Sequence, residues 1–172
     1  RAYVTIPMCC PERASFLSGG FLPQSTGVLT NEAPRGGATV FDDSDTLATR
    51  LQAGGYATGM FGKYLNEYSA LGPYVPPGWT SYVAVDESGP YDDYTATSGS
   101  STPGAPGVGV DTQEDTYVTY WQAALSEAFV VDHATEPLFL YVSFRAPHEP
   151  HEPAHGERES HVVGALLHRR SA

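Results

Sequence analysis

Cysteine is nearly absent from the sequence, which excludes one common way of stabilising a fold. The 172 residues contain two cysteines, Cys9 and Cys10, and they are adjacent. Neighbouring cysteines do not connect distant segments, and a disulfide between them would be strained, so a disulfide-stabilised scaffold is excluded. A zinc site would need further Cys or His residues at defined spacing, which this pair lacks. Catalytic chemistry and simple burial remain as roles for the two thiols.

Basic residues are also scarce, and this limits the kinds of partner. Nine Lys and Arg stand against 20 Asp and Glu, giving a formal net charge of −11. Binding to nucleic acid needs clustered cations, which the chain lacks before its last residues, so a nucleic-acid partner is not expected. An anionic substrate remains compatible with the chain, because a few converging cations dominate the local field. The candidate cations are Arg13, Lys63 and Arg145.

Long apolar runs are absent as well. No stretch approaches the roughly 18 apolar residues of a membrane span, so no membrane-spanning segment is expected. The length and a hydrophobic content of 41% suit one globular core. Because the chain opens on Arg1 directly before a β-prone run, we expect a fragment. Its expected organisation is a partial domain at residues 1–156 and an atypical tail at residues 157–172.

Short apolar and β-branched runs predict four strands. They lie at residues 2–6, 56–64, 81–85 and 138–144. The last run, LFLYVSF, is apolar nearly throughout, as expected for a central strand that is covered on both faces. The stretches between and after these strands that are expected to be loops are residues 21–44, 86–110 and 145–155.

Three helices are expected between the strands. The first follows Pro7, with Pro11 at its first helical position and Gly19 as its stop, which places both cysteines at its N-terminus. The second covers residues 46–53, with Asp45 as its N-cap. The third begins near residue 111 and carries large apolar residues every fourth position, namely Tyr117, Trp121, Leu125 and Phe129.

The alternation of strands and helices predicts an α/β fold with a mainly parallel central sheet flanked by helices. In such sheets ligands bind at the carboxyl ends of the strands. Cys9, Lys63 and His148 each follow a predicted strand, so the topology is expected to gather them at one edge.

Cys9 and Arg13 are four residues apart on the first predicted helix, so both can face one anion. The helix N-terminus would add backbone N–H groups and the positive end of the helix dipole. The loop that cysteine phosphatases wrap around a phosphate is longer than this spacing allows. Burial of both cysteines as small apolar residues stays an equally good interpretation of these facts alone.

Residues 9–20, CCPERASFLSGG, resemble the C-x-P-x-R signature of the sulfatase family, with Cys9, Pro11 and Arg13 in register. Three more family motifs follow in the expected order, and they read GYATGMFGKYLNEY, YVPPGW and FRAPHEPHEPA. The order and spacing resemble N-acetylglucosamine-6-sulfatase-like members of this family, which belongs to the alkaline-phosphatase-like superfamily. The resemblance covers residues 3–155.

The resemblance implies a covalent mechanism. A formylglycine-generating enzyme would oxidise Cys9 to formylglycine, whose hydrate attacks the sulfur of a sulfate ester and later expels sulfate. Arg13 would orient the hydrate and the sulfate, Lys63 would contact sulfate oxygens, and His148 would assist at the leaving oxygen. Asn66 and Glu67 in the motif KYLNEY would touch the sugar.

The resemblance also implies a divalent cation, usually calcium, that contacts position 9. In the family, further ligands come from an Asp-Asp pair after the first strand and a downstream Asp-Asn or Asp-Gln pair, and neither pair is present in register here. The acidic pairs at residues 42–43 and 92–93 follow Cys9 and have the wrong order. Glu12 is a further departure, because relatives commonly carry Ser or another small residue there.

The sequence therefore leads to one hypothesis and two alternatives. The hypothesis is a sulfuric ester hydrolase that acts on sulfated amino sugars or glycosaminoglycan-like substrates through formylglycine. The first alternative is a truncated, inactive homologue that binds sulfated glycans. The second is a phosphate-ester hydrolase of the same superfamily. The sequence does not indicate the cell compartment.

Overall fold

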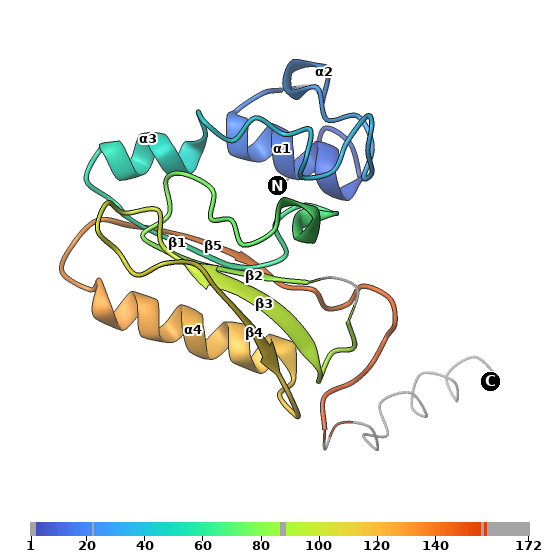
Figure 1. Ribbon diagram of the computed structural model, residues 1–172, viewed down its shortest axis with the longest axis vertical. Coiled ribbons are helices and arrows are strands. Elements are labelled where there is room, and N and C mark those ends of the chain that lie inside the picture. The colour runs from blue at the N-terminus through green and yellow to red at the C-terminus, as the bar shows by residue number, and fades with distance from the viewer. Residues whose placement is uncertain (1–2, 22, 87–88, 156, 158–172) are drawn as a thin grey trace, which may run out of the picture.

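The sheet and its covering helices form an α/β unit. The computed structural model describes residues 3–21, 23–86, 89–155 and 157. Its sheet has the strand order β4-β3-β2-β1-β5, and helices cover both faces (Figure 1). The predicted α/β class is confirmed. The strands are β1 (Ala57–Gly62), β2 (Ser81–Val85), β3 (Tyr94–Gly99), β4 (Gly109–Gln113) and β5 (Leu138–Ser143).

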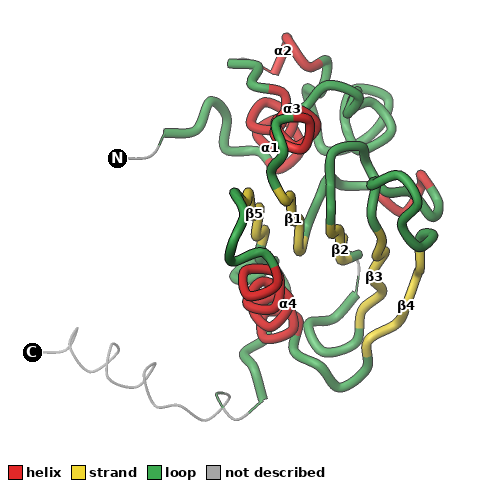
Figure 2. The backbone as a smooth tube through the Cα atoms, turned by 90° about the vertical axis from the view of Figure 1, so that its left-hand side faces the viewer, coloured by secondary structure: helices red, strands yellow, loops and turns green. Residues whose placement is uncertain are grey.

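The helices divide between the two faces of the sheet. Figure 2 shows α1 and α3 on one side of the strands and α4 on the other. The helical segments are α1 (Cys9–Ser18), α2 (Pro23–Thr26), α3 (Leu47–Ala53), the 3-10 turn η1 (Tyr68–Leu71) and α4 (Val118–Asp132). The predicted tail at residues 157–172 lies outside the described residues, apart from Glu157.

The sheet has a parallel part and an antiparallel part. Strand β1 pairs in parallel with β2 and with β5, and we call these three strands the parallel part. Strands β3 and β4, the antiparallel part, continue the sheet from β2 by antiparallel pairing. The parallel centre agrees with the sequence prediction, whereas the predicted loop at residues 86–110 is wrong over these two strands. Tyr94 and Ala96 are buried on one face, a period of two that the surrounding Ser, Thr and Gly residues obscure.

Strand β5 shows why its sequence is apolar nearly throughout. Leu138 and Leu140 pack into the cluster beneath α4, whereas Phe139 and Tyr141 pack into the cluster beneath α1 and α3. Coverage on both faces is therefore confirmed. The predicted central position is wrong, because β5 ends the sheet within the described part of the chain.

Residues 3–6 are not a strand, contrary to prediction. The main-chain N–H groups of Thr5 and Ile6 donate to the carboxylate of Glu12, at 3.1 and 3.5 Å, instead of to a neighbouring strand. Glu12 also accepts a bond of 2.9 Å from the Thr5 hydroxyl. A side chain of α1 therefore replaces the sheet as partner of this segment.

Two predicted helix starts are shifted. Helix α1 begins at Cys9, two residues before Pro11, and ends as predicted at Gly19, which has a left-handed φ of 71°. Both cysteines therefore lie at the helix N-terminus as expected. Helix α4 begins at Val118 because residues 109–113 pair with β3 instead. Trp121, Leu125 and Phe129 of α4, with Tyr117 at its N-cap, pack in the predicted stripe toward the sheet and the loops beside it.

The N-cap of α3 is Thr46, not Asp45. Thr46 Oγ1 accepts from the Thr49 N–H at 3.3 Å, and the Thr49 hydroxyl accepts from the Thr46 N–H at 2.8 Å, a reciprocal capping box. Asp45 instead forms an ion pair of 2.7 Å with Arg50. Thr46 therefore caps the helix in place of Asp45, and it is buried beside the helix end, whereas Asp45 is exposed.

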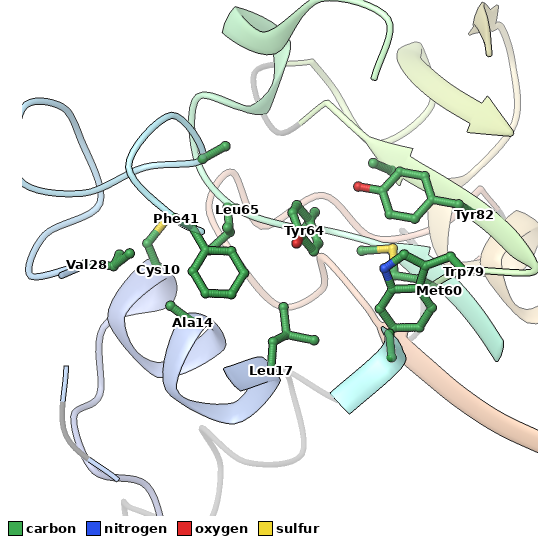
Figure 3. Close-up of a cluster of buried hydrophobic side chains, with 13 residues drawn as sticks. Cys10, Ala14, Leu17, Val28, Phe41, Met60, Tyr64, Leu65, Trp79 and Tyr82 are labelled. Atoms are coloured by element: carbon green, nitrogen blue, oxygen red, sulfur yellow. The ribbon is translucent and has the colours of Figure 1, made fainter. Parts of the chain in front are cut away.

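The largest core cluster lies between α1, α3 and the sheet. Figure 3 shows side chains of α1 facing residues of the sheet and of the segment after β1. Among the described residues, no helix has the length and apolar character that crossing a membrane requires. The cluster fixes α1 on the sheet, and thereby fixes Cys9 near the carboxyl ends of the parallel strands.

Candidate active site

Cys9 lies at the mouth of a hollow between α1 and the end of β5. The hollow has a volume of about 490 Å³, and we call it the Cys9 hollow. Cys9 is the first residue of α1 and is half-buried. The polar and aromatic residues beside it are Glu12, Arg13, Tyr141, Ser143 and Phe144. Cys9 and Arg13 line the same hollow, as their four-residue spacing predicted.

The guanidinium of Arg13 connects α1 with the carboxyl ends of two parallel strands. Its Nη1 donates to the carbonyl oxygen of Lys63 at 2.9 Å and to the Tyr141 hydroxyl at 3.2 Å. It also donates to the Ser143 hydroxyl. These acceptors hold the positive charge of Arg13 in the lining of the hollow, where an anion would compensate it.

The N-terminus of α1 supplies fewer free amides than the sequence suggested. Pro11 occupies the third helical position and has no N–H group. The N–H of Cys10 donates to Asn31 Oδ1 at 3.0 Å. Anion binding in this hollow therefore depends more on Arg13 than on main-chain groups.

Lys63 stands between two cavities. Its main chain adjoins the Cys9 hollow, since its N–H donates to Ser143 O at 2.9 Å and its carbonyl accepts from Arg13. The residue is only 7% exposed. It lines a second cavity of about 440 Å³, the Lys63 pocket, together with residues that include Glu67, Asp86, Thr95 and Thr97.

His148 lies apart from both cavities. It is an exposed residue of the loop after β5, where its N–H donates to Arg145 O at 2.9 Å. Its carbonyl accepts from the Tyr91 hydroxyl at 2.6 Å, and its Nδ1 lies 2.8 Å from Glu149 O. Within the described part of the chain, the residues that line the Cys9 hollow and the Lys63 pocket do not include His148.

Asn66 and Glu67 both support neighbouring loops. The N–H of Asn66 donates to Cys10 Sγ at 3.0 Å, and its carbonyl accepts from the Ala38 N–H at 2.8 Å. Glu67 Oε2 accepts from the Ala33 N–H at 2.8 Å. Glu67 also lines the Lys63 pocket, whereas Asn66 faces α1. The sugar contacts expected of both residues stay predictions.

Arg145, the third candidate cation, serves a different region. Its guanidinium donates to Gly89 O and, at 3.2 Å, to Pro90 O. The same group lies 4.7 Å from the ring centroid of Tyr91. Arg145 therefore anchors the segment that leads into β3 and does not converge with Arg13.

The described residues do not provide a calcium site. They contain no group of three or more His, Cys, Asp or Glu side chains placed to share a metal. Asp43 accepts from the Tyr74 hydroxyl at 2.9 Å, and burial raises the pKa of its carboxyl group. Asp92 pairs with His155 at 3.2 Å. Cys9 is the one metal contact that the sequence predicted here, and its neighbours do not complete a coordination shell.

Two residues of the site were missed by the sequence analysis. Tyr141 and Ser143 belong to β5 and contact Arg13 with their hydroxyl groups. The available signal was a pair of hydroxyl residues with strand spacing at the carboxyl end of LFLYVSF. The position of that strand beside α1 was not evident from the sequence.

Sequence comparisons show which known proteins this chain is similar to. The model of the family named Sulfatase matches residues 1–163. The extracellular sulfatase SULF-1 homolog of Drosophila melanogaster is 33% identical over 159 residues, which cover 89% of this chain and 14% of that protein. The N-acetylglucosamine-6-sulfatase of Bos taurus is 32% identical over 161 residues, which cover 87% of this chain and 28% of that protein. The chain thus spans 14% to 28% of the length of these two relatives.

Solved structures share the fold. The crystal structure of Ps i-CgsB has a TM-score of 0.61 and 24% identity, and the match covers 86% of this chain and 36% of that one. A Bacteroides fragilis protein described as the sulfatase yidJ has a TM-score of 0.67 and 18% identity over the same shares of the two chains. These likenesses concern the arrangement of helices and strands.

Proposed function

The chain belongs to the sulfatase family, and on this premise we propose that it carries the nucleophile-bearing part of a sulfuric ester hydrolase. The observation that carries the proposal is the meeting of Cys9 and Arg13, two residues of C-x-P-x-R, in one hollow at the ends of parallel strands. That edge of an α/β sheet is where such folds bind their ligands.

Cys9 is the proposed nucleophile position, after conversion to formylglycine by a formylglycine-generating enzyme. The formyl group supplies, as its hydrate, one hydroxyl to attack sulfur and a second to release sulfate. Arg13 binds and orients the sulfate, because its guanidinium is already fixed by the carbonyl oxygen of Lys63, directly after β1, and by the Tyr141 hydroxyl of β5. A fixed cation stabilises developing negative charge without a reorganisation cost.

The Lys63 pocket is the proposed site for the sugar. Lys63 lines this pocket and its carbonyl accepts from Arg13, and we assign its ammonium group to the contact with sulfate oxygens. Glu67 and Asp86 add carboxylates, and Thr95 and Thr97 add hydroxyls, on the other walls. These groups suit the hydroxyl and nitrogen substituents of a sulfated amino sugar. The N-acetylglucosamine-6-sulfatase relative supports this substrate class.

The role proposed for His148 requires a different position of its side chain, because His148 is exposed and does not line the Cys9 hollow. Its assistance at the leaving oxygen requires the loop at residues 145–155 to turn the imidazole toward the Cys9 hollow. The calcium implied by the resemblance requires ligands beyond those that the described residues supply.

The test begins with the chain co-expressed with a formylglycine-generating enzyme. Mass spectrometry of the peptide around Cys9 should show the formyl product at residue 9 and an unmodified thiol at Cys10. Sulfate release from an aryl sulfate and from glucosamine 6-sulfate should exceed phosphate release from the matched phosphate esters. Cys9→Ala and Arg13→Ala should abolish this release, whereas Arg50→Ala, at an exposed arginine of α3, should preserve it.

Each alternative has its own outcome. A thiol alone at residue 9, or turnover that survives Cys9→Ala, would overturn the catalytic proposal. Faster phosphate than sulfate release would establish the phosphate-ester hydrolase. Binding of a sulfated glycan without turnover by the converted chain would establish the inactive homologue.

A further inference from the structure

Cys10 is not merely packed into the core. It is 0% exposed, and Figure 3 shows it between Val28 and Phe41 in the cluster beneath α1. Its Sγ accepts a hydrogen bond from the Asn66 N–H at 3.0 Å. The same thiol donates to Asn66 Oδ1 at 3.3 Å. The buried thiol therefore both accepts and donates a hydrogen bond, in addition to its apolar packing.

The main chain of Cys10 makes a second attachment. Its N–H donates to Asn31 Oδ1 at 3.0 Å, and its Sγ lies 3.7 Å from the carbonyl oxygen of Asn31. One residue therefore joins the first turn of α1 to two other segments. These are the loop around Asn31 and the segment that follows β1.

The second of these segments carries Lys63. Asn66 is three residues after Lys63, and the Lys63 carbonyl accepts from Arg13 Nη1 at 2.9 Å. Helix α1 thus contacts this segment at two points, through Cys10 at its first turn and through Arg13 one turn later. The core cluster holds the helix against the sheet, and these two polar contacts add to the constraint on its rotation and on its height above the strand ends.

We propose that Cys10 is a positioning residue, which fixes Cys9 relative to Lys63 through its hydrogen bonds with Asn66 and Asn31. The inference rests on the proposed function for its catalytic consequence. Of the two neighbouring cysteines, Cys9 faces the hollow and supplies the reacting atom, and Cys10 faces the core and holds that atom in place. Misplacement of a reacting group by about 1 Å can cost on the order of 100-fold in rate.

The test compares three variants in the converted chain. Cys10→Ala removes the hydrogen bonds of the thiol with Asn66 and its contact with Asn31 O, keeps the main-chain bond to Asn31 Oδ1, and should lower kcat by about 10- to 100-fold with little change in KM. Cys10→Ser restores a donor and an acceptor and should recover most of that loss. Val28→Ala is the matched control, because it removes apolar volume from the same cluster and its side chain has no hydrogen-bonding group to lose. It should lower stability and leave kcat unchanged.

A second readout does not need turnover. Amide hydrogen exchange at Asn66 should accelerate in Cys10→Ala, because its acceptor is lost, and stay slow in Val28→Ala. In the unconverted chain, the rate at which iodoacetamide alkylates Cys9, followed by mass spectrometry, should change in Cys10→Ala alone.

The outcomes separate the two proposals. A wild-type chain without turnover would count against the proposed function, while the exchange and alkylation rates would still decide the positioning role. Equal changes in kcat, exchange and alkylation for Cys10→Ala and Val28→Ala would overturn the positioning role and leave Cys10 as a packing residue. Failure of Cys10→Ser to recover activity would also contradict it.

Discussion

The parallel and antiparallel parts of the sheet contribute differently to the candidate site. The parallel strands end at the residues expected to act on the sulfate, since β1 leads to Lys63 and β5 ends at Ser143, which contacts Arg13. The antiparallel part contributes Thr95, Thr97 and Val110 to the wall of the Lys63 pocket. Strand β2 of the parallel part lines the same pocket with Ala84 and Val85, whereas no described residue of β3 or β4 lines the Cys9 hollow. The antiparallel part therefore contributes to the pocket proposed for the sugar and not to the hollow proposed for the sulfate.

This difference has a physical basis. Parallel strands present all their carboxyl ends at one edge, so residues from β1 and β5 converge there with the N-terminus of α1. The antiparallel strands alternate in direction and present side chains along their faces instead. Variants in the parallel part should therefore affect both stability and catalysis, and variants in the antiparallel part should affect stability or substrate choice.

The largest expected effect comes from the glycine at the end of β1. A Cβ at Gly62 would lie 2.0 Å from Ser143 O and 2.5 Å from Gln122 Nε2, at a φ of +124°. Gly62→Ala should lower the free energy of unfolding by about 3 kcal/mol or more. In β4 the nearest atom to a Cβ at Gly109 is Ser98 Oγ at 3.4 Å, which is ordinary contact. Gly109→Ala should therefore change the free energy of unfolding by less than about 0.5 kcal/mol. Equal denaturant midpoints for the two variants would contradict the comparison.

The two arginines that adjoin the sheet separate catalysis from stability. Arg13 joins α1 to the parallel part, and Arg145 joins the end of β5 to the segment before β3. Each change to Lys should lower the free energy of unfolding by about 2 kcal/mol, because carbonyl acceptors lose a guanidinium donor. Arg13→Lys should also lower kcat by about 100-fold, whereas Arg145→Lys should not. A similar kcat for both variants, measured well below their melting temperatures, would show that Arg13 acts only structurally.

Helix α3, which packs on β1, offers a smaller test. Thr46→Ala removes the buried capping box and should lower the free energy of unfolding by about 1 kcal/mol. Asp45→Ala breaks the ion pair between Asp45 and Arg50, whose side chains are 64% and 70% exposed respectively. Because exposed ion pairs contribute little, this variant should lower the free energy of unfolding by less than Thr46→Ala does. Thermal denaturation of both variants measures the difference. The reverse order would restore Asp45 as the N-cap.

Half-buried Tyr68 and buried Tyr94 give the smallest effect and a pH dependence. Burial raises the pKa of Tyr68, above β2, and of Tyr94, on β3, to about 12. The folded state therefore favours the neutral phenols, and their stabilisation is present below the usual pKa of 10.0 and lost as the pH rises toward 12. Tyr68→Phe and Tyr94→Phe should each reduce the loss of stability at alkaline pH.

At neutral pH the two tyrosine variants should differ. The Tyr68 hydroxyl donates to Tyr74 O, so Tyr68→Phe should lower the free energy of unfolding by about 0.5 kcal/mol. The Tyr94 hydroxyl is buried without a hydrogen-bond partner among the described residues, so Tyr94→Phe should not lower it. Urea titrations at pH 7 and pH 11 measure both effects, and a larger neutral-pH loss for Tyr94→Phe would contradict the assignment.

Sequence patterns predicted the elements whose signals are local. Strands β1 and β2, the stop of α1 at Gly19 and the apolar stripe of α4 follow from propensity and periodicity over a few residues. Strand β3 was missed because its buried Tyr94 and Ala96 are separated by small polar residues. Residues 3–6 have a strand-like composition, yet Glu12 takes the N–H groups that a strand would need. Local patterns do not report such distant partners.

The sequence by itself determined that Cys9 and Arg13 lie on one face at the start of a helix, because their spacing is one helical turn. The resemblance to C-x-P-x-R made Cys9 the candidate nucleophile. Only the tertiary structure decided the partners of these residues. It placed β5 beside β1, so that Tyr141 and Ser143 hold Arg13, and it paired Cys10 with Asn66, 56 positions later in the chain. Helical spacing acts over one turn, whereas hydrogen bonds between strand ends depend on how the whole core packs.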